Sequence, residues 1–597
     1  MATAAVVSAA DVKYSVVAFP GDGQSVAVSV DGQAHALAAT QYPNLYSGSA
    51  PAPSDHYQYV LTSSSGSSQQ VAESTTRKLA QGVSQTGNEF FNRSRTIYDV
   101  PALPQAFNPV YPPLFTGMNM SNEVATVILN ANDTGIKAYL QNPKGDFGKI
   151  QVYNMTYITS NQIYTFQNVG IKTSGQSTKE FAKQSWKIDL NVKKFGSGGD
   201  NKQLLFGRTT LKFRAHETDP TFAREKLLLD CLAASGAATL SGSWARLFVN
   251  NEAFGLYLMI DDASTHFIDD VLHAGNYSYP YTGPVYKGNS LSDTEEADLV
   301  YKGDDPSLYS KDVYDPKDDG KADLNKTNEM EPLIGLMKRI QQNETVVDTK
   351  HTLIHMAFNF LSASWDGFWY QASNYYITQD LQSNQWTLIT YDFDETFGNG
   401  IEDDSLITVP YQQFGPSGGN VSRPLQDQVL HGNEATMNEI LTTVVKRFFK
   451  PSIIEPRLNA WTEMLREDIA WDRAIPAKSP GDARQWTLED FETNMKNTTK
   501  DIVGLLEFIT KRSAAVTQQL NITDADEGLP ALEPYTQGKM GDGAAGSSSS
   551  NPGVDTGNNG NVTPGGGGGA DSSASFIHPF STATMALLFS FGAYILL

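Results

Sequence analysis

The chain has 597 residues, more than one compact core accommodates, so we expect two or three domains. Its formal net charge of −22 argues against nucleic acid as a partner, because phosphate backbones are bound by basic surfaces. Its single cysteine, Cys231, excludes a disulfide within the chain and lies in an apolar helical run, so we expect it to be buried in a core.

The N-terminal part of the chain predicts a small all-β domain. Residues 1–10 are small and apolar but lack a basic residue, so we interpret them as a possible remnant of a signal peptide. From 11 to 75, short alternating or β-branched runs are separated by turn sequences such as the Pro-Gly-Asp-Gly at 20–23. This pattern is typical of a sandwich, and the prolines that follow indicate a connector over 76–114.

Three lysines are candidates for binding the phosphates of a nucleotide. They are Lys172, Lys187 and Lys212. In kinases, a strand lysine that pairs with a helical glutamate contacts the phosphates. We favour Lys187 paired with Glu225, in a helix predicted to begin at the Asp-Pro of 219–220. Lys172 and Lys212 remain alternatives, as does a structural lysine whose stem packs on the sheet.

The stretch 365–398 carries the candidate catalytic carboxylates. Asp366 lies among aromatic residues, Asn374 follows eight residues later, and Asp392 and Asp394 follow a predicted strand. On a continuing strand the last two point to the same side and repel unless a cation such as Mg²⁺ or Mn²⁺ lies between them. An Asp, then an Asn, then a strand that ends in Asp is the order of parts in a kinase site. The alternative is solvated acids at a strand end, although apolar neighbours make unpaired carboxylates unfavourable.

Several blocks of sequence resemble the spore coat protein H (CotH) kinase family, in its fungal, cell-surface branch. They are K-Q-S-W-K-I-D-L at 183–190, R-L-F-V-N-N-E-A-F-G-L-Y-L-M at 246–259, V-Y-K-G-N at 285–289, W-D-G-F-W at 365–369, N-Y-Y at 374–376 and Y-D-F-D-E-T-F-G at 391–398. The resemblance implies an α+β fold class, with an atypical protein-kinase-like domain over 115–525 whose C-terminal part is helical. In that part we expect helices over 437–450, 455–472 and 488–520. Near the end of the 246–261 hairpin, where family members often carry a glutamate, this chain has Asp261 and Asp262, and the resemblance implies a hinge against the adenine edge there, with Asp261 as the cofactor-binding candidate.

Taken together, these features predict a kinase that uses ATP and Mg²⁺ or Mn²⁺ to phosphorylate protein hydroxyls. Its predicted catalytic residues are Asp366, Lys187 and Glu225; its cofactor-binding residues are Lys187, Lys172, Lys212 and Asp261; its metal ligands are Asn374, Asp392 and Asp394. The alternative is an adhesin or invasin that binds a host-cell receptor with little or no catalysis. A weaker alternative is a nucleotidyl transferase, because fold resemblance does not fix the reaction.

The C-terminal part of the chain predicts attachment to a surface. Residues 526–575 are rich in Gly and Ser and have little apolar content to bury, which predicts a disordered stalk. The apolar end of 576–597 is too short for an ordinary transmembrane helix but matches a GPI-attachment signal. We therefore expect passage through the secretory pathway to the plasma membrane or cell wall.

Overall fold

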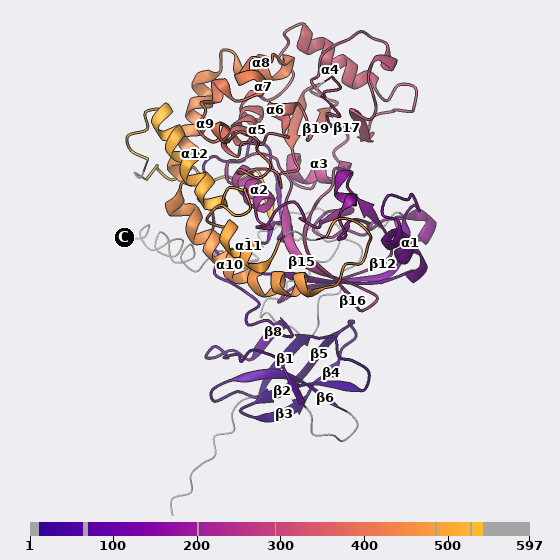
Figure 1. Ribbon diagram of the computed structural model, residues 1–597. Helices are drawn as coiled ribbons and strands as arrows, with labels where there is room; N and C mark the ends of the chain where they lie inside the picture. The colour runs from indigo at the N-terminus through magenta and orange to yellow at the C-terminus, as the bar shows by residue number, and fades with distance from the viewer. Residues whose placement is uncertain are drawn as a thin grey trace, which may run out of the picture.

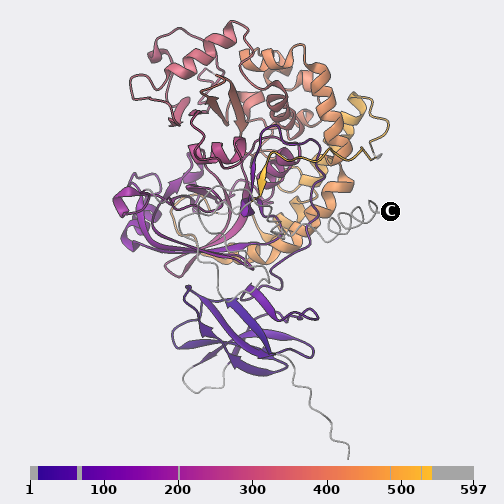
Figure 2. The same ribbon diagram turned by 180° about the vertical axis from the view of Figure 1, so that it is seen from behind.

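The computed structural model describes residues 11–63, 70–199, 202–292, 294–483, 486–525 and 528–540. The predicted signal remnant, most of the predicted stalk and the predicted GPI signal lie outside these residues. A small β unit, a β-barrel and a second sheet with helices follow one another from one end of the molecule to the other (Figures 1 and 2). None of the helices in the described ranges has the length and apolar character that a membrane span needs.

The N-terminal unit consists of two facing β-sheets, as the sequence predicts. Their orders are β4-β5-β1-β8 and β3-β2-β6-β7. The strands are β1 (Asp11–Val17), β2 (Gln24–Val30), β3 (Gln33–Ala36), β4 (Ala38–Ala39), β5 (Leu45–Pro51), β6 (Tyr57–Ser63), β7 (Gln70–Ala72) and β8 (Gln85–Phe90). Val12, Tyr14 and Val16 alternate into the shared core, as in strands with one buried face. Because β8 lies in the predicted connector, the unit extends beyond the boundary predicted at residue 75.

A closed β-barrel begins the main domain. Seven of the described strands pair in the order β10-β11-β12-β13-β14-β16-β15, and β15 closes the barrel in parallel with β10. They are β10 (Ala125–Ala131), β11 (Ile150–Ile158), β12 (Ile163–Ser174), β13 (Ser185–Asp189), β14 (Thr210–Arg214), β15 (Gly242–Val249) and β16 (Glu252–Asp261). Ile171, Trp186 and Phe213 belong to the barrel core, so the residues beside them in sequence point outward.

A second sheet and most of the helices form the rest of the main domain. The sheet has the order β18-β17-β19-β20, with β17 (Thr282–Gly288), β18 (Tyr314–Asp318), β19 (Tyr375–Asp380) and β20 (Trp386–Thr390). The longer helices are α1 (Asp133–Gln141), α2 (Arg224–Ala234), α3 (Thr265–Leu272), α4 (Glu331–Gln341), α5 (Thr349–Leu361), α9 (Glu434–Arg447), α10 (Pro451–Ala474) and α12 (Leu505–Gln519). The shorter ones are α6 (Phe368–Gln371), α7 (Pro416–Gly419), α8 (Pro424–Leu430) and α11 (Leu488–Asn494). Helices α9, α10 and α12 run along one flank from the barrel to the second sheet (Figures 1 and 2).

The barrel and the helical part share strand β16. Tyr257 and Met259 belong to the barrel core, whereas Leu258 and Ile260 pack among the helices outside it. A strand buried on both faces is expected to be a continuous apolar run, and the sequence F-G-L-Y-L-M-I is one. The same helical core buries Cys231, as the sequence predicts.

Helix α5 packs against β20 and contacts the end of that strand. His351 and His355 are both buried on this helix, and the Nδ1 of His355 lies 2.8 Å from the hydroxyl of Thr390. The Nε2 of His351 accepts the backbone N–H of Ala238 at 3.0 Å. His355 therefore fixes the strand that leads into the acidic stretch, and His351 fixes the segment before β15.

Two predicted helices have different bounds in the structure. The helix predicted to begin at 219–220 begins at Arg224, because the carboxylate of Asp219 first accepts backbone N–H groups of an intervening turn. The predicted helix over 488–520 is divided into α11 and α12. The side chain of Asn494, the last residue of α11, binds the backbone of the connecting loop.

The mixed α+β class is confirmed, with all-β sheets at the N-terminus. The protein-kinase-like part of the predicted fold class stays a prediction.

Asp468 on α10 ties three parts of the molecule together. Its Oδ1 lies 2.7 Å from the Nε of Arg93, which follows the N-terminal unit, and 2.6 Å from the Nε of Arg246 on β15. The Nη2 of Arg246 donates to Oδ2 at 2.8 Å. All three side chains are buried, so the charges compensate one another out of contact with water.

A second buried network fixes the end of β16. Arg208 donates its Nε to Asp261 at 2.7 Å, and its Nη1 lies 3.4 Å from Asp270 on α3. Tyr277 donates its hydroxyl to Asp270 at 2.8 Å. Burial raises the pKa of Asp270 to about 7, with Asp261 and Asp269 acting in the same direction and Arg208 and Tyr277 opposing them.

Replacing Asp468 with alanine should lower the free energy of unfolding by about 3–5 kcal/mol, because two guanidinium groups would remain buried without their counter-ion. Urea unfolding of the purified protein measures this. The matched control is Glu463→Ala on the same helix, whose side chain is 63% exposed and pairs with Arg95. That variant should lose at most about 1 kcal/mol. Equal losses in the two variants would contradict the assignment.

The network around Asp270 should make the protein more stable in mild acid. A carboxyl whose pKa is raised by folding contributes stability below its unfolded pKa and loses that contribution as pH rises through its folded pKa. Between pH 5.5 and 8.0, ionisation of Asp270 should therefore lower the free energy of unfolding of the wild type by about 2 kcal/mol. The Asp270→Asn variant cannot ionise at this position and should not show this loss. Urea unfolding at both pH values measures the difference. Glu402→Gln, a substitution of an exposed acid, is the control and should keep the pH dependence of the wild type. If Asp270→Asn also keeps that pH dependence, the prediction is refuted.

Candidate functional site

The three candidate lysines form a row on the outer face of the barrel. Lys172 on β12 is the register partner of Lys187 on β13, and Lys187 is the register partner of Lys212 on β14. Their neighbours in sequence fill the barrel core, so the lysines point away from it. Adjacent strands are about 4.8 Å apart, so the row spaces three cations closely. The alternatives that the sequence left open are thus neighbours in one row.

Asp262 neutralises part of this lysine row. It forms an ion pair with Lys187, and its Oδ1 lies 3.4 Å from the Nζ of Lys212. Although its burial opposes ionisation, the two lysines lower the pKa of Asp262 to about 2. Among the described residues, Lys172 has no ion-pair partner, and its pKa is lowered by burial and by the nearby Lys187 and Lys149. The row therefore keeps positive charge that its own carboxylate does not balance.

The predicted cofactor residue Asp261 lies on the other side of the strand. It pairs with the buried Arg208 and accepts the backbone N–H of Ser241 at 2.7 Å. Successive residues of a strand point to opposite faces. Asp262 therefore faces the lysine row, whereas Asp261 faces the buried network of Arg208. Asp262, which sequence reasoning did not select, is the residue that faces the lysines.

Arg214 is the centre of the acidic cluster. Its Nε lies 2.9 Å from the carboxylate of Glu225 on α2. Its Nη2 lies 2.5 Å from Asp392 and 2.7 Å from Asp394, which both follow β20. The prediction that Lys187 pairs with Glu225 is therefore wrong, because Arg214 occupies the position between that glutamate and the acidic stretch. Sequence reasoning did not select Arg214, although it lies two residues after Lys212 and so on the same face of β14.

The two aspartates meet by a route that differs from the predicted one. β20 ends at Thr390, and Asp392 has a left-handed backbone with φ of 66°, so the strand does not continue through the pair. Asp394 also accepts the hydroxyl of Thr218. Gly398 closes the segment with φ of 87°, a conformation that favours glycine, and a Cβ there would lie 2.7 Å from Val503. The turn, rather than strand alternation, brings both carboxylates to one guanidinium.

Asn374 holds Asp366 in place. Its amide nitrogen donates both to the backbone oxygen and to the side-chain Oδ2 of Asp366, each at 2.8 Å. Burial raises the pKa of Asp366 to about 7, and the charges of Asp392 and Asp394 act in the same direction. The backbone N–H of Tyr391, next to Asp392, donates to the backbone oxygen of Asn374 at 2.9 Å, so Asn374 and the Asp366 that it binds lie beside the acidic stretch.

The cluster contains more carboxyl groups than the one guanidinium among them can pair with. Burial raises the pKa of Glu225 to about 8, of Asp394 to about 6 and of Glu395 to about 8, and neighbouring carboxylates contribute in each case. Asp392 is the exception: desolvation opposes its ionisation, but Arg214 holds its pKa below the usual range. One guanidinium therefore does not satisfy all the acids around it, and an additional cation would be stabilised here.

Lys287 on β17 joins the site from the second sheet. Its Nζ lies 5.5 Å from the centre of the Tyr391 ring, and the Nζ of Lys212 lies 5.9 Å from the same ring. Burial and the charge of Lys212 lower the pKa of Lys287 to about 8. The only sequence signal for this residue was its place in the V-Y-K-G-N block, so sequence reasoning gave it no role. Lys287 extends the row of cations toward Asp392.

The predicted metal ligands fit a divalent cation only after Arg214 moves. Within the described part of the chain, no group of three or more His, Cys, Asp or Glu side chains is arranged to hold a metal ion. The two oxygens that converge, from Asp392 and Asp394, already face one nitrogen of Arg214. The Asp392 side chain is 33% exposed, so an ion can reach it from solvent. Asn374 keeps its carbonyl oxygen as a further oxygen donor.

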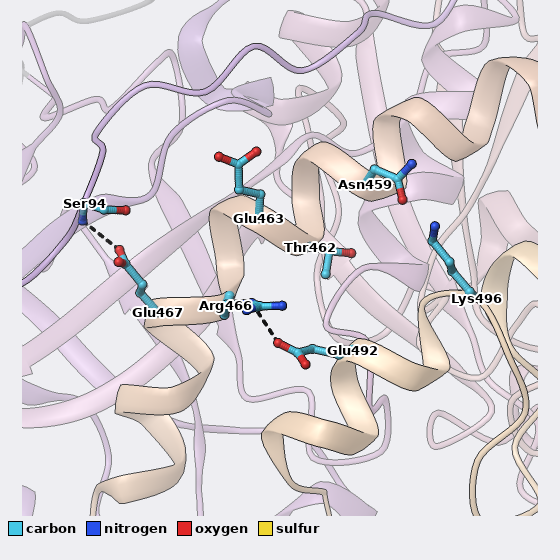
Figure 3. A pocket seen from close by; sticks show the side chains of 8 residues that line it. All are labelled: Ser94, Asn459, Thr462, Glu463, Arg466, Glu467, Glu492 and Lys496. Atoms are coloured by element: carbon cyan, nitrogen blue, oxygen red, sulfur yellow. Dashed lines mark hydrogen bonds and ion pairs between the residues drawn. The ribbon is translucent and has the colours of Figure 1, made fainter. Parts of the chain in front are cut away.

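A separate surface hollow of about 470 Å³ lies away from these residues, against α10 and α11 (Figure 3). It is lined by Ser94, Asn459, Thr462, Glu463, Arg466, Glu467, Glu492 and Lys496. Glu467 accepts the backbone N–H of Ser94 at 2.9 Å, and the Nε of Arg466 lies 2.7 Å from Glu492. Two further lining charges have partners outside the hollow, Glu463 with Arg95 and Lys496 with Glu455, so its charges are largely compensated.

Comparison with known proteins gives one family and several relatives. A family model described as CotH kinase protein matches residues 171–516. The chain is 30% identical over 563 residues to a protein named Invasin CotH2 from Rhizopus delemar, an alignment that covers 88% of this chain and 87% of that protein. It is 29% identical to Invasin CotH3 of the same organism, over 87% of this chain and 86% of the relative. It is 27% identical to Spore coat protein homolog 1, also from Rhizopus delemar, over 79% and 77%.

Proposed function

The chain belongs to the CotH kinase protein family, and we propose that it is an atypical protein kinase at the cell surface. It would transfer the γ-phosphoryl group of ATP to hydroxyl groups of proteins. The observation that carries this proposal is the arrangement of Asp392 and Asp394 about one cation, with the lysine row of β12, β13 and β14 nearby. Phosphoryl transfer depends mainly on positioning and charge neutralisation, and this arrangement offers both.

The lysine row is the proposed phosphate-binding surface. Lys187 and Lys212 share one carboxylate, Asp262, so an incoming triphosphate would compete with that carboxylate for both amines. Lys172 extends the row on one side, and Lys287 contributes from the second sheet. Lysine binds phosphate as a point charge, and several such charges in a row suit a chain of phosphates.

Asp366 is the proposed group that orients the acceptor hydroxyl. Its carboxylate is fixed by Asn374, and its other oxygen is left for the hydroxyl of a protein substrate. Asp392, Asp394 and the carbonyl oxygen of Asn374 would hold Mg²⁺ or Mn²⁺. A divalent cation, when bound, neutralises charge on the transferred group. Glu225 would serve by holding Arg214 beside these residues, rather than by pairing with Lys187.

The relatives support a place at the cell surface. Two of them are named invasins and a third is named a spore coat protein homolog. We extend this to the chain as a cell-surface protein, with the predicted GPI signal at 576–597 as its means of membrane attachment. Its partners would be protein substrates or a receptor on a host cell.

A second candidate function is that of an invasin with little or no catalysis. The names of two of the relatives given above favour it, because both are called invasins. Binding of a receptor would use exposed loops and would not require the buried acids around Arg214. The two functions are therefore separable by substitutions within the acidic cluster.

Incubation of the secreted protein with Mn²⁺ and γ-labelled ATP tests the kinase proposal. We expect label on the protein or on an added acceptor protein, and a loss of at least about 100-fold in Asp366→Asn and in Asp392→Asn, because each removes a positioned catalytic group. The control is Asp304→Asn, an exposed acid paired with Lys338, which should keep wild-type transfer. Transfer from α-labelled ATP instead would indicate a nucleotidyl transferase.

The same Asp392→Asn variant, displayed on cells, separates the two functions. If the protein is both kinase and invasin, attachment to host cells should persist while transfer is lost. Absence of transfer by the wild type, together with normal attachment, would overturn the kinase proposal and leave the invasin proposal standing.

A further inference from the structure

Arg214 occupies the place that a metal ion would take. It extends from β14 of the barrel into a cluster of acids from two other segments, α2 and the turn after β20. Only 16% of its side chain is exposed. The Nη2 group faces one oxygen of Asp392 at 2.5 Å and one oxygen of Asp394 at 2.7 Å. Asp392 and Asp394 are the residues that would hold a divalent cation, so the ion would compete with this nitrogen for the same carboxylates.

The guanidinium has a second anchor that does not conflict with a metal. Its Nε lies 2.9 Å from Glu225, whereas the nitrogen that faces the aspartates is Nη2. A rotation that moves Nη2 away from Asp392 and Asp394 can therefore keep part of the side chain held by α2. Lys212, two residues earlier, lies on the same face of β14, so the phosphate-binding row begins beside Arg214. A phosphate on that row would offer the displaced guanidinium a bidentate partner.

We propose that Arg214 is an internal counter-ion that closes the metal site in the metal-free protein and leaves it when metal and nucleotide bind together. This inference rests on the proposed function, because it assumes that Asp392 and Asp394 are metal ligands. It goes beyond that function by assigning a gate to the site. Metal alone must compete with Arg214 for both aspartates, whereas metal with a polyphosphate gives the guanidinium a new anion. Binding of the two ligands is therefore coupled.

Direct binding of Mn²⁺, measured by the loss of its free-ion electron paramagnetic resonance signal, tests the gate without any activity assay. Removing the charge in Arg214→Gln should strengthen Mn²⁺ binding in the absence of nucleotide by about 10-fold or more, because the competing cation is gone. Arg214→Lys, which keeps a positive charge, should bind Mn²⁺ much as the wild type does. The matched control is Arg95→Gln, whose exposed ion pair with Glu463 lies elsewhere.

The coupling gives a second readout. Inorganic triphosphate should strengthen Mn²⁺ binding more for the wild type than for Arg214→Gln, after correction for the Mn²⁺–triphosphate complex in solution. Thermal melting in chelator should also be lower for Arg214→Gln than for the wild type, and Mn²⁺ should restore it, because the ion then replaces the missing counter-ion. A variant that folds only when Mn²⁺ is present would support the same conclusion.

The outcomes separate this inference from the proposed function. Equal or weaker Mn²⁺ binding by folded Arg214→Gln, with phosphoryl transfer intact in the wild type, would overturn the gate alone. Tighter Mn²⁺ binding by the variant, with no phosphoryl transfer by the wild type, would support the gate and overturn the kinase. The absence of Mn²⁺ binding by both proteins would overturn the metal site and the gate together.

Discussion

The main domain depends on one guanidinium placed among carboxylates. Arg214 comes from the barrel, Glu225 from the helix that packs against it, and Asp392 and Asp394 from the turn after the second sheet. Carboxylates that lie close together in a buried site repel one another, so their ionised forms require a cation between them. Arg214 meets that requirement only in part, and the raised pKa of Glu395 is one sign of the remaining excess.

The fold explains how residues far apart in sequence reach this centre. Strand alternation on the barrel turns Lys172, Lys187 and Lys212 outward because their neighbours fill its core. The antiparallel pairing of β19 with β20 sets Asn374, just before one strand, near the acids just after the other. The proposed chemistry therefore lies between a rigid barrel and a rigid sheet, which is where positioning is most exact for side chains.

Local patterns were enough to predict much of this architecture. Apolar alternation located the barrel strands and the strand before Asp392, and charged residues that interrupt such strands identified the lysines and the acids. Partners over long distances were not predictable in the same way. Lys187 pairs with Asp262 and Glu225 pairs with Arg214, because Arg214 lies between Glu225 and the acidic stretch. Asp262 rather than Asp261 faces the lysines, and a strand's end, uncertain by one residue in sequence, decides which face a side chain takes.

The most direct test of the account is a structure of the protein with Mn²⁺ and a non-hydrolysable ATP analogue. The account predicts phosphates along the lysine row, the ion on Asp392 and Asp394, and the Nη2 of Arg214 withdrawn from both. Analogue bound elsewhere, such as in the hollow of Figure 3, or bound while Arg214 keeps its contacts with both aspartates, would contradict it.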